Sequence, residues 1–382
     1  MGPLTTTRIA HVISGAWSVG GAERIVAALV AGGEARGWAQ LVLNPFSRPS
    51  SAAFAALCGE RRYEGRFCDR SLGVPALRLW LRRRLAEFSP HVVHGHLFHG
   101  AVLLASLPHS ESQRQLLTHH YGDWRVGGAR GGPRQVLDRW AGSRFDQVVA
   151  VSDSVKRFLL DDYKYAPAKV IRIANGWDGD PGPPAAAQPV PTVVCVGLFR
   201  AEKGHSTLLS SFQLVRRELP DARLVLVGDG ELRPALLHQI ATTGLEGSVE
   251  MVGTVTDVWP YLAHADVFAL ASVSESFGMG IVEAMAAGLP VVAPAIGGIP
   301  ELVRPGVNGE LFPPGDIAAL ARHVIDLLRS PETRSQMGAA GRDLAQRFRM
   351  ETMVQSYFEL YENMLELSPS RARLGRDDMP RS

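Results

Sequence analysis

Two glutamates, Glu275 and Glu283, flank a glycine turn in the most distinctive segment of the sequence. The residues Phe277, Gly278 and Met279 between them lead into a helical pattern, so Glu275 is expected before a helix and Glu283 about two turns inside it. Backbone N–H groups at such a helix start favour an anion, and a carboxylate accepts hydrogen bonds from two hydroxyls at once. The spacing predicts a site for an elongated anionic ligand. On spacing alone, a solvated helix residue at Glu283 is an equal alternative.

Two cations follow a buried apolar run in the same half of the chain. Thr192 to Val196 has the composition of a parallel strand, and Gly197, Arg200 and Lys203 come directly after it. Ligands of parallel sheets bind at the carboxyl ends of the strands, so Arg200 and Lys203 are expected at an edge where a ligand can bind. Ordinary loop charges are the alternative.

Histidines and glycines mark corresponding positions in the first half. The segment Thr118-His119-His120 follows an apolar run, and His120 or its neighbour His119 can offer both a hydrogen-bond donor and an acceptor. The histidines at 94, 96 and 99 lack the accompanying carboxylates or cysteines of a metal site, so we predict no metal site. Gly20-Gly21 predicts a turn that can approach a ligand closely, which by itself is a weak signal.

The elements that must position these residues alternate between strand and helix patterns throughout the chain, which predicts α/β domains with parallel sheets. A segment rich in proline and glycine interrupts the alternation, and the same pattern then restarts. The predicted organisation is a Rossmann-like domain over 1–180, a linker over 181–191, a second Rossmann-like domain over 192–350, a C-terminal helix over 351–367 that packs back on the first domain, and a disordered tail over 368–382. The two doubly wound domains are expected to face each other across an active-site cleft.

Composition and charge exclude several classes of protein. With 46% hydrophobic and 20% charged residues the chain has an ordinary globular composition, and we expect it to be cytoplasmic because it shows neither a signal peptide nor a long apolar segment. Residues 1–180 carry a net charge of +8 and residues 181–382 one of −6. The basic half is compatible with peripheral contact at an inner membrane face, although a solvated surface explains it equally. Nucleic acid is not an expected partner, because the basic residues are not interleaved with aromatic ones.

The helical run around Arg82, with leucines at 77, 81 and 85 on one stripe, predicts a helix that covers the first sheet.

The segment from Glu275 to Ala293, with Glu-x7-Glu followed by Ala-x-Ala-x-Gly-Leu-Pro-Val-Val-Ala, strongly resembles glycosyltransferase family 4. The resemblance extends over nearly the whole chain, in the segments Gly20-Gly21-Ala22-Glu23, Val151-Ser-Asp-Ser154, Asn175-Gly-Trp-Asp178, Gly228-Asp-Gly-Glu231, Gly297-Gly-Ile-Pro-Glu301 and Asn308-Gly309. It implies the GT-B architecture and a retaining transfer from a nucleotide sugar, which is a substrate, with no metal and no other cofactor.

The resemblance also implies roles for individual residues. Catalytic roles fall to His120, Arg200, Lys203 and Glu275; nucleotide-sugar binding falls to Gly20, Gly21, Gly197, Arg200, Lys203, Phe277, Gly278, Met279 and Glu283; acceptor binding falls to Glu23, Trp124 and Arg125. In this scheme Glu283 holds the ribose hydroxyls, Glu275 contacts the transferred sugar, and His120 hydrogen-bonds that sugar. The Trp124 segment is rich in glycine and arginine and departs from the family pattern, so a plain solvent loop is as good an interpretation of it.

The function that the resemblance implies is transfer of a sugar, from a UDP-sugar in preference to GDP-mannose, to a hydroxyl of a small molecule or a lipid-linked saccharide. Two alternatives stay open at this point. One is a non-hydrolytic nucleotide-sugar epimerase of the same architecture, and the other is a non-catalytic nucleotide-binding protein, which would need a broken nucleotide-sugar site.

Overall fold

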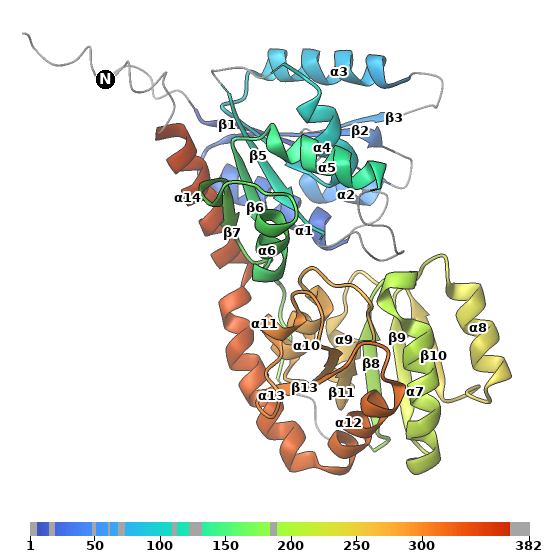
Figure 1. The fold of residues 1–382 in the computed structure, drawn as a ribbon. Coiled ribbons are helices and arrows are strands. Elements are labelled where there is room, and N and C mark those ends of the chain that lie inside the picture. Colours follow the sequence, from blue (N-terminus) through green and yellow to red (C-terminus); the bar gives the residue numbers. More distant parts are fainter. Residues whose placement is uncertain are drawn as a thin grey trace, which may run out of the picture. The chain divides into compact units, whose positions relative to one another are not determined.

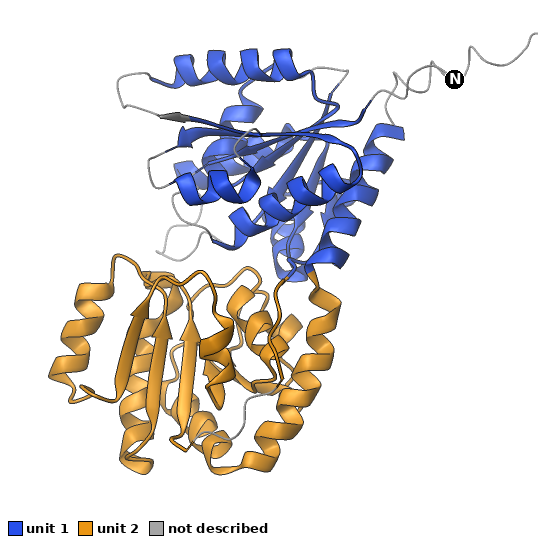
Figure 2. Ribbon diagram, turned by 180° about the vertical axis from the view of Figure 1, so that it is seen from behind, with its two compact units in different colours: residues 1–176, 350–382 blue, residues 177–349 orange. Residues whose placement is uncertain are grey.

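The computed structural model describes residues 6–14, 20–47, 51–59, 62–67, 73–108, 113–121, 132–183 and 189–366. The chain divides into two compact units, coloured separately in Figure 2. Unit 1 comprises Met1–Gly176 and Met350–Ser382, and unit 2 comprises Trp177–Arg349. The predicted tail over 368–382 lies outside the described residues.

Unit 1 is built on a seven-stranded sheet with the order β3-β2-β1-β4-β5-β6-β7, in which neighbouring strands are parallel (Figure 1). Its strands are β1 (Arg8–Ile13), β2 (Ala39–Ser47), β3 (Tyr63–Phe67), β4 (Val92–His96), β5 (Arg114–His119), β6 (Gln147–Ala150) and β7 (Val170–Arg172). Its helices are α1 (Gly21–Ala35), α2 (Ala52–Cys58), α3 (Gly73–Phe88), α4 (Phe98–Ala105), α5 (Pro133–Ser143), α6 (Asp153–Asp161), a 3₁₀ turn at Pro167–Lys169, and α14 (Met350–Glu366).

The core of unit 1 forms where the last helix of the chain covers the sheet. Ile9, Val92 and Leu116, from three neighbouring strands, pack with Tyr357 and Phe358 of α14 in one buried cluster. The central strands β1, β4 and β5 are buried along almost their whole length, as is typical of parallel strands that are covered on both faces of a sheet. On α3, the leucines at 77, 81 and 85 are the buried residues, which confirms the predicted covering helix.

Unit 2 contains a second parallel sheet, of six strands in the order β10-β9-β8-β11-β12-β13 (Figure 1). The strands are β8 (Thr192–Val196), β9 (Arg223–Val227), β10 (Val249–Gly253), β11 (Val267–Ala269), β12 (Val291–Pro294) and β13 (Gly309–Phe312). The helices are α7 (His205–Glu218), α8 (Arg233–Thr242), α9 (Trp259–Ala263), α10 (Met279–Ala287), α11 (Ile299–Leu302), α12 (Ile317–Arg329) and α13 (Pro331–Ala345), with 3₁₀ turns at Ala201–Lys203 and Gln346–Phe348. The two α/β domains expected from the sequence are therefore present.

The chain passes between the units at places that differ slightly from the predicted boundaries. Unit 2 begins at Trp177, ahead of the linker expected over 181–191. The reason is that Trp177 is a core residue of unit 2: it is 1% exposed, its backbone N–H donates to the Phe348 carbonyl, and its indole N–H donates to the Ala345 carbonyl. The chain returns to unit 1 after Arg349, so α14 belongs to unit 1.

Two edge strands, β3 and β13, have no counterpart in the sequence prediction. Their sequences, Tyr63-Glu-Gly-Arg-Phe67 and Gly309-Glu-Leu-Phe312, are short and include glycine and charged residues. Such segments carry too little hydrophobic periodicity to be recognised as strands. Within the described residues no helix is both long and apolar enough to cross a bilayer.

Candidate functional site

The loop after β8 carries the two predicted cations of unit 2. Gly197 donates its backbone N–H to Val227, and the chain then turns through the 3₁₀ helix Ala201–Lys203, which places Arg200 and Lys203 at the carboxyl edge of the sheet. Arg200 is exposed to solvent, whereas the Lys203 side chain is 26% exposed. The loop therefore carries one exposed cation, Arg200, and one largely buried cation, Lys203, at the edge where ligands of parallel sheets bind.

Glycines hold this loop against its neighbours. Gly204 has a φ of +65°, and a Cβ atom there would lie 1.9 Å from the Ala271 carbonyl oxygen in the loop after β11. The same two loops are joined by the backbone N–H of Val273, which donates to the Glu202 carbonyl. Only glycine permits both the left-handed backbone and this approach, so the positions of Lys203 and of the segment after β11 are fixed together.

Lys203 and Glu275 form an ion pair across these loops. The Lys203 Nζ atom lies 2.6 Å from Oε2 of Glu275, whose side chain is 11% exposed. Burial lowers the pKa of Lys203, but the nearby carboxylates, chiefly that of Glu275, outweigh it and raise the pKa overall. The ammonium group is thus kept charged in a partly desolvated place, which is what binding of a charged ligand group requires.

A third loop fixes the backbone of Glu275. Gly298 donates its N–H to the Glu275 carbonyl at 3.1 Å, and a Cβ atom on Gly297 would lie 1.8 Å from the same oxygen. The segment then reaches Phe277, which is buried, and Gly278, whose φ of +106° starts α10. Glu275 is therefore held at the edge of the sheet by contacts of its own main chain.

The start of α10 offers backbone N–H groups at the same edge. Ile281 and Val282 already donate to the Gly278 carbonyl, so helix geometry leaves the N–H groups of Met279 and Gly280 without an acceptor inside the helix. A Cβ atom on Gly280 would lie 2.9 Å from the Val196 carbonyl, which means that the helix start rests directly on the end of β8. Glu283 lies in the next turn and is 6% exposed, so it is a buried residue and not a solvated one.

In unit 1 the predicted histidine His120 follows β5, beside a row of histidines on the neighbouring strands. Register explains the row: His11 of β1 pairs with His94 of β4, and His96 pairs with Thr118 of β5. Because side chains two residues apart share a face of a sheet, these residues and His120 all lie on the same face. The face is covered by α14, whose Tyr361 hydroxyl lies 2.7 Å from Nδ1 of His94.

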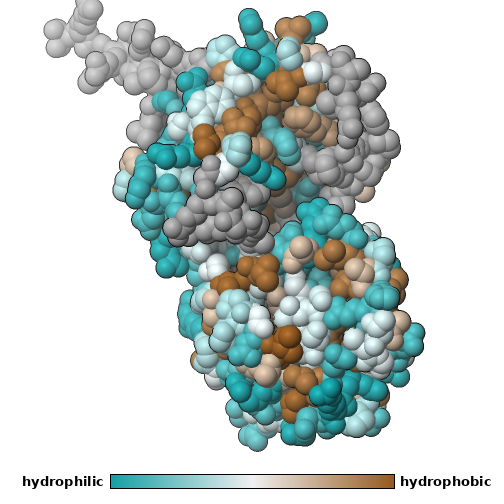
Figure 3. Space-filling view, turned by 45° about the vertical axis from the view of Figure 1, so that its right-hand side comes forward, coloured by the Kyte–Doolittle hydropathy of each residue, from teal (hydrophilic) through white to brown (hydrophobic). Residues whose placement is uncertain are grey.

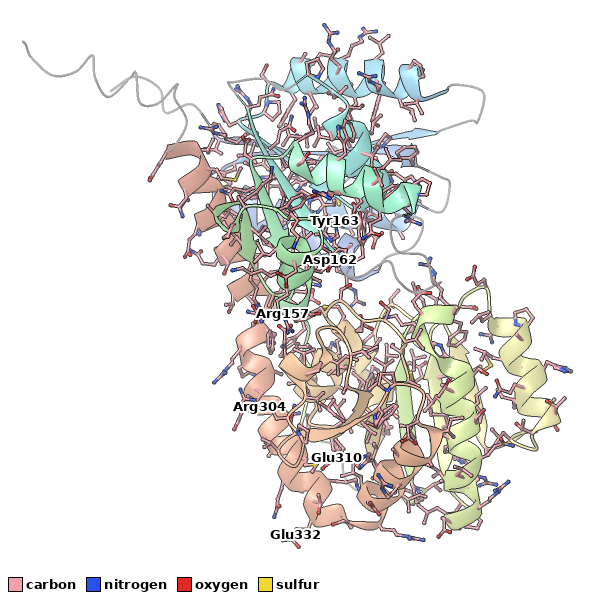
Figure 4. The ribbon with its side chains drawn as sticks, viewed as in Figure 1. Arg157, Asp162, Tyr163, Arg304, Glu310 and Glu332 are labelled. Carbon is pink, nitrogen blue, oxygen red and sulfur yellow. The ribbon has the colours of Figure 1, made fainter. Side chains whose placement is uncertain are left out.

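The two adjacent histidines 119 and 120 have different surroundings. His119 is 1% exposed, and its ring nitrogens lie 2.6 Å from the Tyr121 carbonyl oxygen and 2.8 Å from Oδ2 of Asp138. Tyr163, which follows α6 and is labelled in Figure 4, donates its hydroxyl to the same Asp138 oxygen at 2.7 Å. Both ring nitrogens of His119 are therefore hydrogen-bonded within unit 1. His120 is half-buried, so this geometry favours His120 as the residue that can reach a ligand.

The histidine row also has the spacing of a metal site. Ligand atoms of His11, His94 and His96 lie within 4.8 Å of one another, a group that includes a histidine absent from the sequence-based set of 94, 96 and 99. Each ring nitrogen of His94 nevertheless faces a hydroxyl at 2.7 Å, Tyr361 on one side and Thr118 on the other. These contacts make hydrogen bonding a sufficient explanation of the cluster.

The remaining predicted residues of unit 1 lie at the start of α1 or outside the described ranges. Gly20 precedes α1 and donates its N–H to Oε2 of Glu23, which is 7% exposed, so the carboxylate predicted to bind the acceptor caps the helix. Gly21 is the first residue of α1. Trp124 and Arg125 lie outside the described residues. Sequence reasoning missed His11, Gln40 and Asp138, whose positions depend on strand neighbours and not on a local motif.

Comparison with known proteins identifies both halves of the chain. Residues 182–344 match the family model described as "Glycosyl transferases group 1", and residues 19–180 match "Glycosyltransferase Family 4". The chain is 33% identical over 174 residues to N-acetyl-alpha-D-glucosaminyl L-malate synthase of Bacillus anthracis, a match that covers 45% of each chain. It is 32% identical over 225 residues to the phosphatidyl-myo-inositol mannosyltransferase of Mycobacterium leprae, covering 56% of this chain and 59% of that one. The matches thus span about half the length of these curated relatives.

Solved structures match over almost the whole chain. A glycosyltransferase from Rickettsia africae superposes with a TM-score of 0.78 at 19% identity, covering 95% of this chain and 100% of the other. The Anabaena protein HepE, solved in complex with UDP and glucose, superposes with a TM-score of 0.79 at 22% identity, covering 94% of this chain and 99% of the other. At these identities the likeness shows a shared fold.

Proposed function

The chain belongs to glycosyltransferase family 4 and has the two-domain GT-B fold, and from this premise we propose that it is a retaining glycosyltransferase that needs no metal ion. It takes a sugar from a nucleotide-diphosphate donor, with a UDP-sugar favoured over GDP-mannose, and transfers it to a hydroxyl of a small molecule or of a lipid-linked saccharide. It acts in the cytoplasm.

The observation that carries this proposal is the charged pair at the carboxyl edge of the unit 2 sheet. Lys203 is kept protonated by Glu275 at 2.6 Å, and the start of α10 presents backbone N–H groups that have no acceptor inside the helix at the same edge. A leaving nucleotide diphosphate gains negative charge in the transition state, and preorganised donors are most effective where that charge develops. Arg200, exposed on the same loop, supplies the second cation.

The remaining roles follow from what each group can bind. Glu283, buried in α10, holds the ribose hydroxyls, and Glu275 contacts the transferred sugar. His120 hydrogen-bonds that sugar from unit 1. In a retaining front-face reaction the phosphate oxygen of the leaving group takes the proton of the incoming acceptor hydroxyl, so neither glutamate is a nucleophile. The solved HepE complexes with UDP and UDP-glucose support the choice of a uridine nucleotide.

A turnover assay with UDP-, GDP- and ADP-sugars, each with and without a chelator, tests the proposal. We expect the enzyme to turn over the sugars of one nucleotide class. The same nucleotide sugars should raise the melting temperature, because they bind only the folded chain. Activity that is lost in chelator and restored by magnesium or manganese would contradict the metal-independent mechanism. Turnover with inverted anomeric configuration, read by NMR of the product, would contradict retention.

Contact with a membrane surface is a further part of the proposal, and the exposed face of α5 supports it. Val136, Leu137 and Trp140 are 59%, 46% and 42% exposed, and Arg139 and Arg144 are exposed beside them. On the face drawn in Figure 3, unit 1 carries hydrophobic side chains bordered by hydrophilic ones. Apolar and basic groups on one helix face bind anionic lipid surfaces. Co-sedimentation with vesicles of anionic lipid, compared with vesicles of neutral lipid, tests this; a Trp140→Ser variant that binds equally well would contradict it.

A further inference from the structure

Four side chains on one face of the unit 1 sheet form a continuous hydrogen-bonded row that ends at His120. Oε1 of Gln40 lies 3.3 Å from Nε2 of His11, Nδ1 of His11 lies 3.2 Å from Nε2 of His96, and Nδ1 of His96 lies 3.4 Å from Nε2 of His120. The residues come from β2, β1, β4 and the end of β5, which are neighbours in the sheet. We call this set the imidazole row.

Every link of the imidazole row except the first joins two ring nitrogens. A neutral imidazole has one N–H and one lone pair on opposite sides, so the state of each ring fixes what its neighbour must do. The amide oxygen of Gln40 can only accept, which requires the proton of His11 on Nε2 and leaves its Nδ1 as an acceptor. His96 must then donate from Nε2 and accept at Nδ1, and His120 must donate from Nε2 in turn.

The environment keeps the rings neutral, as this logic requires. His11 and His96 are 0% exposed, and Gln40 is 8% exposed. Burial lowers the pKa of His11 to about 4 and that of His120 to about 3, and it lowers the pKa of His96 well below its ordinary value. A second proton on His11 or on His96 would set two donors against each other within the row, because both nitrogens of these two rings face a neighbour.

We propose that Gln40, His11 and His96 are positioning residues that fix the tautomer of His120, so that its Nδ1 faces the ligand as a hydrogen-bond acceptor. Within the described residues no hydrogen-bond partner lies at that nitrogen. This inference rests on the proposed function, in which His120 binds the transferred sugar, and it sharpens that role: His120 accepts a hydrogen bond from a sugar hydroxyl and does not donate one.

Substrate selectivity follows from the direction of that bond. A hydroxyl can donate to Nδ1, whereas a methoxy group or a fluorine at the same carbon cannot. A site built to receive a hydroxyl proton discriminates strongly against analogues that lack it. The row therefore restricts the donor to sugars with a free hydroxyl at the position that His120 meets.

The direct test is the tautomer of each ring in the free protein. ¹⁵N-histidine labelling with multiple-bond ¹H–¹⁵N correlation distinguishes Nε2–H from Nδ1–H rings, and the variants His11→Gln, His96→Gln and His120→Gln assign the three signals among the 12 histidines. We expect all three to be neutral Nε2–H tautomers between pH 6 and pH 8. An Nδ1–H tautomer or an even mixture at His120 overturns the proposal, and so does a stoichiometric metal ion bound by these rings in the purified protein.

Two variants separate positioning from general packing. Gln40→Met removes the acceptor but keeps the volume, so we expect the His120 signal to become a mixture of tautomers and kcat/KM to fall about threefold to tenfold, as for one lost neutral hydrogen bond. The matched control is Tyr361→Phe, which removes the partner of His94 on the same sheet face without touching the row. We expect this control to leave the His120 tautomer unchanged, and the same signal change in both variants would overturn the proposal.

The outcomes also separate this inference from the proposed function. If all three rings are Nε2–H tautomers but no nucleotide sugar is turned over, the imidazole row stands and the transferase function fails. If turnover is found while the tautomers are mixed, the function stands and the row does not set His120.

Discussion

The two units hold their functional residues by different means. In unit 2, Lys203 and Glu275 are fixed by main-chain contacts that only glycines allow, at Gly204 and Gly297. In unit 1, His120 is held by side chains from strands far apart in the sequence, through His96 and His11. The first arrangement is encoded locally, in loops with recognisable motifs. The second is encoded by strand order, so it becomes visible only when the sheet is known.

The largest effect should appear when unit 1 is taken to acidic pH. Burial lowers the pKa of His11 to about 4 and that of His120 to about 3, and it holds the pKa values of His94 and His96 well below 6.5. The unfolded chain therefore binds more protons than the folded one below pH 6.5, and stability falls as the pH falls from 6.5 towards 4. His11 alone contributes a loss of about 3 kcal/mol across that interval.

Unit 2 is the internal control for this experiment, because its one histidine with a lowered pKa among the described residues is His205, at about 4. Urea unfolding at pH 7.5 and at pH 5, with pulse-labelling hydrogen exchange read by mass spectrometry, reports each unit separately. We expect the peptides of unit 1 to lose more stability than those of unit 2. Equal losses in the two units would contradict the assignment of the buried neutral imidazoles.

The next effect tests the glycine contacts of unit 2. Gly204→Ala puts a Cβ atom 1.9 Å from the Ala271 carbonyl on a residue with φ of +65°. The matched control is Gly244→Ala, where φ is +68° and nothing lies within 4 Å of the added atom. We expect the control to cost about 1–2 kcal/mol, the ordinary cost of a left-handed backbone, and Gly204→Ala to cost about 3 kcal/mol or more because a backbone atom must also move. Urea midpoints measure both, and equal costs would show that the loop contact is not needed.

The same contrast decides how much of the molecule could be predicted from the sequence. The strand and helix alternation predicted both sheets, since apolar runs and glycine turns are local signals, but it missed β3 and β13, whose short polar edge sequences lack them. The unit 2 residues Gly197, Arg200, Lys203 and Glu275 were predicted together because they lie in motifs near strand ends. Glu23 was predicted as an acceptor ligand, and the cap that it makes to Gly20 depends on backbone geometry at the start of α1.

His11 and Gln40 could not be found in this way. A single histidine inside the apolar run Arg8–Ile13 has no partner along the chain, and its contacts depend on the pairing of β1 with β4 and on the place of β2 in the sheet order. The same holds for Asp138, which meets His119 from a helix 19 positions further along. Polar residues inside a predicted buried strand are the available signal, because a buried polar group needs a partner.

The charged pair of unit 2 should affect turnover more than stability. We expect Lys203→Met to lower kcat roughly a hundredfold, about 3 kcal/mol, since it removes one preorganised cation from the developing diphosphate charge. Arg329→Met breaks the exposed pair with Glu218, which is 2.8 Å long, and is the matched control with unchanged kcat. Steady-state kinetics with the active nucleotide sugar measures both. Full turnover by the Lys203→Met variant would show that this cation does not stabilise the leaving diphosphate.

The smallest effect concerns the hydroxyls that α14 brings to unit 1. Tyr361→Phe leaves Nδ1 of His94 without its partner at 2.7 Å, inside a region where both residues are at most 1% exposed. Loss of a hydrogen bond by a buried group lowers the free energy of unfolding by about 1–2 kcal/mol. Tyr261 is half-buried on α9 of unit 2, so Tyr261→Phe should lower it by about 0.5 kcal/mol or less. Urea midpoints of the two variants measure the difference. If Tyr361→Phe is as mild as Tyr261→Phe, then the hydroxyls of α14 do not hold the histidine face, and unit 1 is stabilised by apolar packing of that helix alone.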